Sequence, residues 1–246
     1  QSGRSLALTA LGYYSSLQAK PQASIAYFQQ GVTAAHGAHD VRLEAMALNG
    51  LANITAKAGN KQEALATYQQ AEQLVGMTGD RICAASILGG IGFVYLSVGD
   101  PKSAYRYVEQ EVATFQAINA TWGVAEAKLD LGRIQNNLRE HEKALQTLDE
   151  AMQLFRSLGM DRMEGHALRE IGGVQQSMGN LTGALSTFKQ ALDRIHPGQD
   201  QRYKAFTLSH IASVLESMQK EDEALRYYEA ALPLSKEAAD TAGESN

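Results

Sequence analysis

The sequence predicts an all-α protein, built as a solenoid of about six helical hairpins with about twelve helices. Three observations lead to this prediction. Similar residues recur every 40 positions along the 246-residue chain, and glycine followed by asparagine or aspartate separates the apolar segments. Within each segment apolar residues lie three and four positions apart, the spacing of one buried helical face. A period of this length is typical of repeat proteins, whose stacked hairpins share a continuous core.

Composition supports a folded helical chain and excludes several function classes. The chain is 44% hydrophobic and 20% charged, with only 4 prolines, as expected for a folded protein rich in helix. Its net charge of -5 argues against a general nucleic-acid partner. No apolar run reaches the roughly 18 residues of a membrane span, and no signal pattern opens the chain. We therefore expect no membrane insertion and a cytoplasmic location.

The first helix of each repeat carries a small residue after an aliphatic one. The six pairs, each 40 residues apart, are Leu11-Gly12, Leu51-Ala52, Ile91-Gly92, Leu131-Gly132, Ile171-Gly172 and Ile211-Ala212. Because a small side chain lets a second helix approach closely, this column should mark where each hairpin closes.

The second helix of each repeat carries a small residue followed by a large one four positions later. The small residues are Ser24, Ala64, Ala104, Ala144, Ala184 and Ala224. The large residues are Phe28, Tyr68, Val108, Leu148, Phe188 and Tyr228. Three positions further a small residue returns, as in Gly31 and Ala71, and only Glu111 breaks that column. We expect the large residue to fill the space left by the small residue of the first helix.

Turn signals set the ends of the predicted helices. Glycine ends a helix in the left-handed conformation and asparagine or aspartate caps the next one, as in Gly59-Asn60 and Gly99-Asp100. Between repeats the same signals appear at Gly37 to Asp40, Gly79 to Asp80, Gly159 to Asp161 and Pro197 to Asp200. The junction at residues 118–121 lacks glycine, so Asn119 or Thr121 should serve there. The predicted helices are 4–18, 22–36, 41–58, 61–76, 81–98, 101–117, 121–138, 141–157, 161–178, 181–195, 201–218 and 221–236.

These columns resemble the tetratricopeptide repeat (TPR) family, whose signature has Leu-Gly-x-x-Tyr in the first helix and Ala-x-x-x-Phe in the second. Ile91-Gly92-Phe93-Val94-Tyr95 and Ala184 to Phe188 carry it best. The tryptophan of the family is replaced by leucine, and by Lys128 in the fourth repeat. The 40-residue length resembles the subclass of kinesin light chains, Pins/LGN adaptors and bacterial arrays that precede CHAT or other effector domains.

The resemblance implies a right-handed superhelix in one domain over residues 1–246. Its repeats would span about 7–46, 47–86, 87–126, 127–166, 167–206 and 207–246. We expect this domain to be part of a longer protein, because the chain begins at Gln1 without an initiator methionine and the last repeat ends in Ser235 to Asn246 without a further solvating helix.

In this family the first helices line a concave groove. Side chains at the matching positions predict a peptide-binding groove of amides, cations and aromatic rings: Tyr13, Asn49, Asn53, Lys57, Phe93, Arg133, Asn136, Asn137, His166, Arg169 and Gln176. Amides can hold an extended peptide backbone and arginine suits carboxylates. We therefore expect an extended, acidic or carboxyl-bearing segment, with Phe93 as the apolar anchor. The alternative is that these residues are solvated polar groups on a scaffold with contacts elsewhere.

No catalytic or cofactor motif stands out in the sequence. It contains no phosphate loop, no Gly-x-Ser-x-Gly and no His-Glu-x-x-His. His36 and His39 are interpreted as solvated loop residues without a third metal ligand, and Cys83 as a small buried hydrophobe. We expect no enzyme activity, no cofactor and no metal.

Two functions remain open on the sequence alone. The first is a protein-protein interaction scaffold that binds a protein or peptide. The second is the regulatory or sensor arm of a larger bacterial enzyme or signalling protein, such as one with a CHAT protease-like domain. Self-association through uncapped ends is a further expectation, because the open face of a solenoid is apolar.

Overall fold

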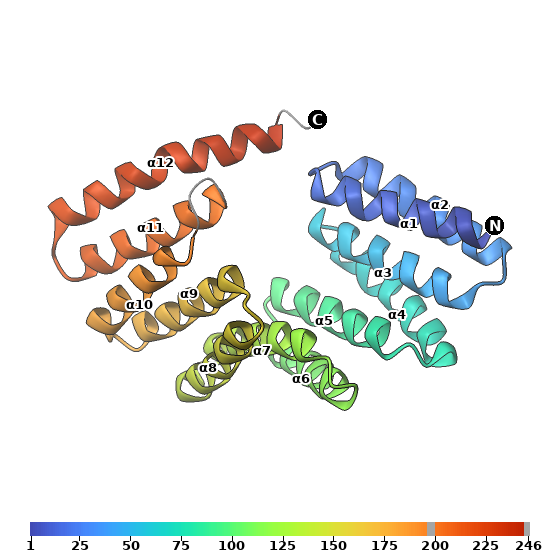
Figure 1. The fold of residues 1–246 in the computed structure, drawn as a ribbon, viewed down its shortest axis with the longest axis horizontal. Helices are drawn as coiled ribbons and strands as arrows, with labels where there is room; N and C mark the ends of the chain where they lie inside the picture. The colour runs from blue at the N-terminus through green and yellow to red at the C-terminus, as the bar shows by residue number, and fades with distance from the viewer. Residues whose placement is uncertain (196–199, 244–246) are drawn as a thin grey trace. The chain divides into compact units, whose positions relative to one another are not determined.

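The computed structural model describes residues 1–195 and 200–243, and these form twelve α-helices and no strand (Figure 1). The helices are α1 (Ser2–Leu17), α2 (Pro21–Gly37), α3 (Val41–Lys57), α4 (Lys61–Thr78), α5 (Arg81–Ser97), α6 (Pro101–Ala117), α7 (Thr121–Asn137), α8 (His141–Ser157), α9 (Asp161–Ser177), α10 (Leu181–Asp193), α11 (Gln201–Ser217) and α12 (Glu221–Gly243). The prediction of an all-α chain of six hairpins is confirmed.

The helices form two compact units, α1–α6 in unit 1 and α7–α12 in unit 2. In each unit, consecutive helices pair as three hairpins, and the second helix of a hairpin also packs against the first helix of the next one. First helices touch as well, α1 with α3, α3 with α5, α7 with α9 and α9 with α11. The odd-numbered helices of each unit therefore form one continuous layer.

The small-residue column closes the hairpins as the sequence predicts. A Cβ added at Gly12 would lie 2.8 Å from the Phe28 ring, and one at Gly132 would lie 2.5 Å from Cγ of Leu148. Real side chains almost never come so close. Each glycine thus makes room for the large residue sixteen positions later, in the second helix of the same hairpin.

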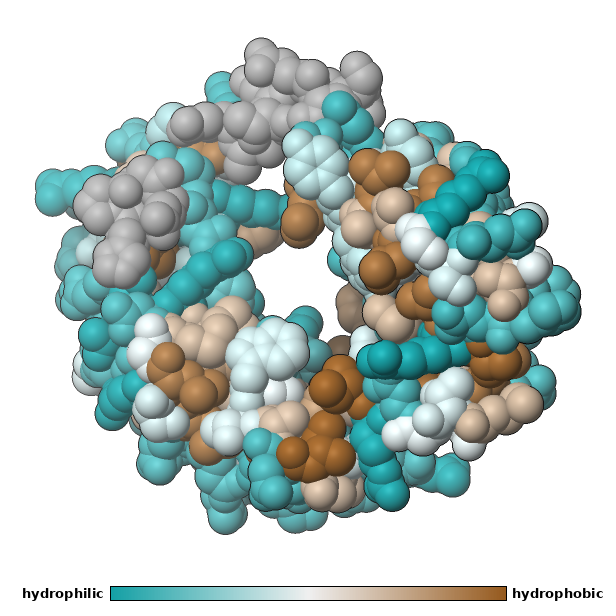
Figure 2. Space-filling view, turned by 45° about the vertical axis from the view of Figure 1, so that its right-hand side comes forward, coloured by the Kyte–Doolittle hydropathy of each residue, from teal (hydrophilic) through white to brown (hydrophobic). Residues whose placement is uncertain are grey.

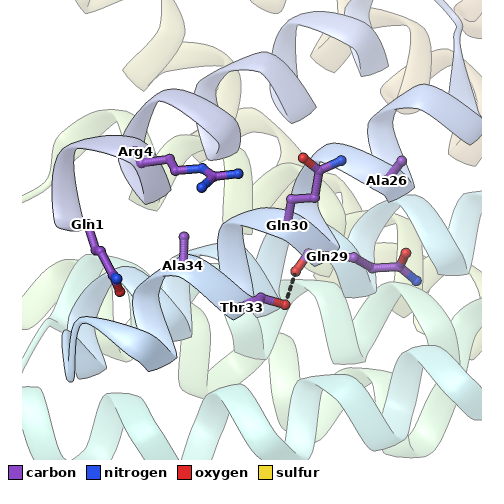
Figure 3. A pocket seen from close by; sticks show the side chains of 7 residues that line it. All are labelled: Gln1, Arg4, Ala26, Gln29, Gln30, Thr33 and Ala34. Carbon is purple, nitrogen blue, oxygen red and sulfur yellow. Dashed lines mark hydrogen bonds between the residues drawn. The ribbon is translucent and has the colours of Figure 1, made fainter.

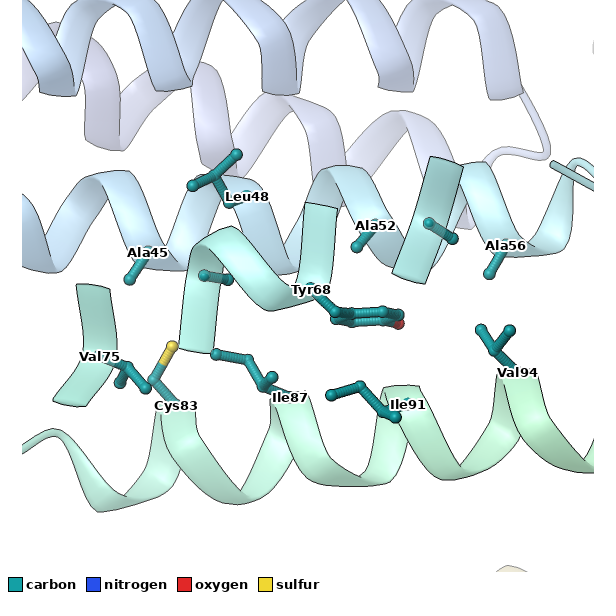
Figure 4. Packing of buried hydrophobic residues seen from close by; sticks show 12 residues of the cluster. Ala45, Leu48, Ala52, Ala56, Tyr68, Val75, Cys83, Ile87, Ile91 and Val94 are labelled. Carbon is teal, nitrogen blue, oxygen red and sulfur yellow. The ribbon is translucent and has the colours of Figure 1, made fainter. Parts of the chain in front are cut away.

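Tyr68 lies at the centre of the unit 1 core (Figure 4). It is fully buried among small and aliphatic residues of α3 and α5, including Ala52, Ile87 and Ile91. A Cβ at Gly90 would lie 2.2 Å from its hydroxyl oxygen. Tyr68 therefore joins two hairpins, and its burial raises the pKa of the hydroxyl.

Two similar cores hold unit 2 together. The first, between α7, α8 and α9, centres on Leu148 and Phe155. The second, between α10, α11 and α12, centres on Phe188, Ile211 and Leu215. The same columns are used in both units, so the packing follows the 40-residue repeat.

The exception at Glu111 has a local explanation. Other second helices carry glycine or alanine in this column, whereas Glu111 is larger and almost completely buried. The facing residue on α5 is Gly89, where a Cβ would lie 2.4 Å from Oε1 of Glu111. The absence of a side chain at Gly89 on α5 thus leaves room for the longer side chain of Glu111 on α6.

A left-handed residue recurs about every twenty positions. The residues with positive φ are Ala19, His39, Gly59, Gly79, Gly99, Asn119, Arg139, Gly159, Gly179, Asp200 and Gln219. The expectation for Asn119 is confirmed. The expectation for Gly37 is wrong, because Gly37 lies inside α2 and His39 adopts the left-handed conformation. The Pro197 to Asp200 junction lies largely outside the described residues.

Aspartate and asparagine cap several helices as predicted. The side chains of Asp40, Asp80, Asp100 and Asn180 each accept a hydrogen bond from the backbone amide three residues later. Asn60 precedes α4 without such a bond, and Asp161 is the first residue of α9 rather than its cap. A side-chain acceptor at these positions satisfies one of the amides that a helix start leaves unpaired.

The last helix is longer than the sequence analysis predicts. We expected it to end near residue 236, with no further helix after Ser235, but α12 continues through Pro233 to Gly243. Residues 236–242 contain alanine, glutamate and lysine but no glycine, so they carry no strong signal to stop. None of the helices in the described part of the chain combines the length and hydropathy of a membrane span.

Candidate functional site

The exposed side of the first helices differs between the two units. We call the surface of α1, α3 and α5 that carries Tyr13, Met46, Asn53, Ile82 and Phe93 the unit-1 face. The surface of α7, α9 and α11 that carries Glu126, Arg133, His166, Arg169 and Phe206 is the unit-2 face. Spacings of three, seven and eleven residues place these side chains on the side of each helix that faces away from the hairpin core.

The unit-1 face contains a cavity of about 220 Å³. Its lining comes from three first helices and one N-cap: Tyr13, Arg42, Met46, Asn49, Asp80, Ile82, Cys83 and Ser86. The Tyr13 ring meets Phe28 edge-on at 5.0 Å between centroids. Tyr13 and Asn49 belong to the predicted groove, whereas Met46 and Ile82, which also line the cavity, were not predicted.

Asn49 and Asn53 are tied into the layer of first helices. Asn49 is buried, and its Nδ2 donates to Oγ of Ser86 on α5 at 3.0 Å. Asn53 Nδ2 donates to the Asn49 carbonyl oxygen at 2.9 Å. The two predicted amide side chains therefore lie together beside the cavity. The amide of Asn49 already links α3 to α5 through its bond to Ser86.

One end of the unit-1 face carries cations beside an aromatic ring. Phe93 is about half exposed, and Lys61 Nζ lies 5.3 Å from its ring centroid. Lys57 is exposed. This arrangement combines an apolar surface with positive charge, which suits an apolar side chain next to a carboxylate.

The other end of the cavity carries one ion pair. Nε of Arg42 lies 2.7 Å from Oδ2 of Asp80. Although partial burial of Asp80 raises its pKa, hydrogen bonds from the Cys83 amide and from Arg42 hold that pKa below its usual value. Asp80 therefore stays ionised where it caps α5. Cys83 is buried as expected, and burial raises the pKa of its thiol to about 11.

On the unit-2 face both predicted arginines are paired with acids. Arg133 lies 2.9 Å from Asp130 and 3.8 Å from Glu170. Arg169 lies 2.6 Å from Glu170. Burial, together with the charge of Asp130, raises the pKa of Glu126 to about 7. Asp130 lies one helical turn from Arg133 and Glu170 one turn from His166, so the helical spacing alone could have revealed both acids.

His166 and Arg169 enclose the ring of Tyr203. The His166 ring stacks on Tyr203 at 4.2 Å between centroids and 6° between planes. The Arg169 guanidinium carbon lies 4.9 Å from the Tyr203 centroid. Burial, followed by the charge of Arg169, lowers the pKa of His166 to about 4. Tyr203, which the sequence analysis did not single out, thus organises both residues and donates a hydrogen bond to the Gly165 carbonyl.

The remaining predicted amides bond to their own unit. Gln176 Nε2 donates to Ser213 Oγ on α11 at 3.2 Å. Asn136 Oδ1 lies 2.9 Å from Nδ1 of His141, and Asn137 Nδ2 donates to the Arg133 carbonyl at 2.9 Å. The bond from Gln176 to Ser213 repeats, in unit 2, the link that Asn49 and Ser86 make in unit 1. One role of these amides is therefore to connect neighbouring first helices.

A second cavity, of about 440 Å³, lies on α1 and α2 (Figure 3). Gln1, Arg4, Gln29, Gln30 and Thr33 give it a polar lining. No residue of the predicted groove lines it. Among the side chains that the structure describes, in residues 1–195 and 200–236, no group of three or more histidine, cysteine or acidic side chains could hold a metal ion.

Comparison with solved structures shows the same fold in several proteins. The crystal structure of BtubC (BKLC) from P. vanneervenii aligns with a TM-score of 0.71 and 19% identity, over 90% of this chain and 91% of that one. A Rap protein complexed with Competence and Sporulation Factor aligns with a TM-score of 0.76 and 16% identity, over 98% of this chain and 66% of that one.

The chain also resembles part of a larger protein. A signal transduction ATPase with numerous domains (STAND) from Pyrococcus horikoshii, which has a tetratricopeptide repeat sensor, aligns with a TM-score of 0.74 and 15% identity. That alignment covers 100% of this chain and 39% of the larger one. No match was found among curated protein sequences.

The sequence itself matches a family model for the tetratricopeptide repeat. The matches cover residues 43–117, 123–196 and 163–237, which is more than half of the chain. The hairpins, their spacing and the small-to-large packing all agree with this match. The chain therefore belongs to the tetratricopeptide repeat family.

Proposed function

We propose that this protein is an interaction scaffold whose unit-1 face binds an extended segment of a partner protein. The observation that carries the proposal is the cavity lined by side chains from α1, α3 and α5. An apolar side chain of the partner would enter between Tyr13, Met46 and Ile82. Burying one such side chain contributes about 1.5–3 kcal/mol, which is enough to anchor a short segment.

The polar groups around the cavity define the chemistry of the segment. Asn53 and Ser86 can bond to an extended backbone on one side of the cavity. Lys61 places positive charge next to Phe93, and Lys57 adds an exposed cation at the end of α3. A segment with an apolar residue followed by a carboxylate fits this order, so an acidic partner remains our proposal.

We propose a separate binding surface on unit 2, formed by Arg133, Asn136, Asn137, His166, Arg169 and Gln176. Because the two arginines already neutralise Asp130 and Glu170, their contribution to an acidic ligand should be smaller than that of Lys57. The Rap protein with the same fold was crystallised with Competence and Sporulation Factor, which supports a binding role for such an array. A cytoplasmic location and the lack of enzyme activity stay predictions.

A random peptide library displayed on phage tests the proposal. The library is panned against residues 1–246, and the selected peptides are titrated against wild type, Ile82→Asp and the matched control Met77→Asp. Both residues are exposed apolar side chains, but only Ile82 lines the cavity. We expect Ile82→Asp to weaken binding about tenfold or more and the control to bind as wild type. Equal binding to both variants, at equal melting temperature, would contradict the proposal.

The alternative function is the sensor arm of a larger signalling protein. It is favoured by the alignment of the whole chain with 39% of the STAND protein that carries a tetratricopeptide repeat sensor. Determining the full coding sequence that contains these residues distinguishes the two. An adjoining ATPase or protease domain would support the sensor arm.

A further inference from the structure

The cavity on the unit-1 face lies at one end of a longer strip of accessible side chains on α3. The molecular surface is mostly hydrophilic, with hydrophobic patches (Figure 2). On α3 the side chains that reach solvent on the unit-1 face are those of Arg42, Met46, Asn53 and Lys57. Spacings of four, seven and four residues place them all on one side of the helix. This strip, which we call the α3 strip, therefore runs parallel to the helix axis.

Two side-chain contacts fix the alignment of α5 beside α3. Nε of Arg42 lies 2.7 Å from Oδ2 of Asp80, the N-cap of α5. Nδ2 of Asn49 donates to Oγ of Ser86 at 3.0 Å. The partners are 38 residues apart in the first contact and 37 in the second. Because this offset hardly changes along the chain, α3 and α5 run side by side in the same direction, and α5 borders the α3 strip along its length.

The rise of the α-helix gives the length of the strip. Met46 lines the cavity, and Lys57 lies eleven residues later on α3. At 1.5 Å per residue, this separation is about 16 Å along the axis. On α5 the separation is the same, because Ile82 lines the cavity and Phe93 lies eleven residues later. The cavity and the far end of the α3 strip are thus about 16 Å apart on both helices.

The two ends of the α3 strip differ in charge. At the cavity, the cation of Arg42 is already paired with Asp80. At the far end, Lys57 is exposed and forms no ion pair within residues 1–195 and 200–236. On the α5 side of that end, Nζ of Lys61 lies 5.3 Å from the centroid of the Phe93 ring. The uncompensated positive charge of the strip therefore lies at its far end, where it suits a carboxylate.

Asn53 lies between the two ends and can hold a peptide backbone. Its Nδ2 donates to the Asn49 carbonyl oxygen at 2.9 Å. Among the residues that the structure describes, no donor reaches its Oδ1, so this oxygen can accept from a backbone amide. Asn53 lies seven residues after Met46, which is about 10 Å along the helix. An extended chain rises about 3.3 Å per residue, so the amide of the third residue from an anchor in the cavity would reach it.

We propose that the partner segment lies lengthwise on the α3 strip as an extended chain and carries an acidic residue four positions from its apolar anchor. This inference rests on the proposed function and adds the orientation and the spacing of the segment. A distance of about 16 Å corresponds to between four and five extended residues.

The geometry of an extended chain selects four positions over five. Successive side chains of such a chain point to opposite sides, so a residue four positions away points to the same side as the anchor. A residue five positions away points to solvent. The Lys57 side chain also leans toward the start of α3, which shortens the distance that the acidic side chain has to span.

Peptides that differ only in the position of one acid test the inference. A phage-selected peptide whose affinity falls with Ile82→Asp keeps its apolar anchor, and its acidic residues are changed to glutamine. One glutamate is then placed two to seven positions from the anchor, on either side, and affinities are measured by fluorescence anisotropy. We expect glutamate four positions away, on one side of the anchor, to tighten binding about threefold. It should have little effect at three or five positions, and the gain should disappear in about 1 M salt.

A charge swap identifies Lys57 as the partner of this glutamate. In Lys57→Glu, a peptide with lysine four positions from the anchor should bind about tenfold more tightly than the peptide with glutamate there. The matched control is Lys102→Glu, which reverses an exposed cation on α6. It should keep the preference of the wild type for glutamate. Equal melting temperatures of the two variants confirm that both are folded.

Failure of this inference can be told apart from failure of the proposed function. If no selected peptide loses affinity for Ile82→Asp, the proposed function is wrong, and the spacing is wrong with it. If peptides depend on Ile82 but bind equally well at every spacing, or best at another spacing, only the lengthwise placement is overturned. A preference for glutamate that survives in Lys57→Glu would likewise overturn it, because the carboxylate would then lie elsewhere.

Discussion

The unit-1 face and the unit-2 face use the same positions of the repeat but differ in chemistry. On α1, α3 and α5 these positions carry Tyr13 and Ile82, which line a cavity with one ion pair at its rim, and Phe93 farther along α5. On α7, α9 and α11 they carry arginines paired with acids, and a histidine stacked on a tyrosine. Because these side chains do not close hairpins, the scaffold tolerates either set. One face is thus equipped to bury an apolar group, whereas the other satisfies most of its own charges.

The largest expected effect compares one junction position in the two units. Glu164 in unit 2 is 2% exposed and accepts hydrogen bonds from Arg156, with Arg194 also at 3.2 Å. We expect Glu164→Ala to lower the free energy of unfolding by about 2 kcal/mol, since it removes the charge-assisted hydrogen bonds that Arg156 donates to a buried carboxylate. In unit 1, Glu44 pairs with the exposed His36, so Glu44→Ala should cost less than about 1 kcal/mol. Urea denaturation of both variants measures the difference, and similar losses would contradict it.

The next prediction compares the cations of the two faces as ligand groups. Lys57→Glu in unit 1 should weaken the binding of a selected acidic peptide about tenfold, because an exposed cation is replaced by a charge that repels the peptide. Arg133→Gln with Arg169→Gln in unit 2 should weaken it about threefold or less. Fluorescence anisotropy titrations give both values. A larger loss of affinity in the arginine variant than in Lys57→Glu would show that the main binding surface lies on unit 2.

The third prediction concerns stability at acid pH. The two units should differ here, because the stacked histidines lie in unit 2. In the unfolded chain His166 takes up a proton near pH 6.5, whereas in the folded chain burial and Arg169 delay this to about pH 4. The stabilising contribution is therefore fully present above about pH 6.5 and is lost as the pH falls toward 4. His166→Phe keeps an aromatic ring on Tyr203 and should reduce the loss of melting temperature over this range. An unchanged pH profile in the variant would assign the acid sensitivity to other groups.

The smallest effect is expected at the turns, which the two units share. Arg139 in unit 2 and Ala19 in unit 1 are left-handed without being glycine. Arg139→Gly and Ala19→Gly should each raise the free energy of unfolding by about 1 kcal/mol, because glycine adopts this conformation without strain. Gly99→Ala is the matched reverse change and should lower it by a similar amount. Thermal unfolding of the three variants is the measurement.

Helix positions could be predicted closely because they depend on a repeated pattern. The small column at Gly12 and its large partner at Phe28 recur often enough to set the register of nearly every helix. The end of α12 was missed because no glycine or cap marks it before Gly243. His39 was missed because histidine carries no strong preference for a left-handed turn, and only the twenty-residue rhythm places it there.

The candidate site was predictable only in part. The repeat register shows which helix face a residue occupies, and it placed Tyr13, Phe93 and Arg169 on the exposed side of the first helices. It does not show what the neighbouring helix supplies. The hydroxyl of Ser86 that engages Asn49, and the carboxylate of Glu170 that engages Arg169, depend on side-chain geometry and close packing. A polar residue can therefore be placed correctly and still have its bonding capacity used within the protein.

The left-handed residue every twenty positions also governs how such a gene can change in length. Removing residues 40–79 would join His39 to Asp80, a left-handed residue to an aspartate that caps the following helix. The same holds for duplicating forty codons at an equivalent point, because each new turn inherits its stop and its cap. A step of twenty would place a second helix where a first one belongs and would turn its closing small residue away from its partner. Insertions or deletions in multiples of forty codons are thus the changes in length that preserve this fold.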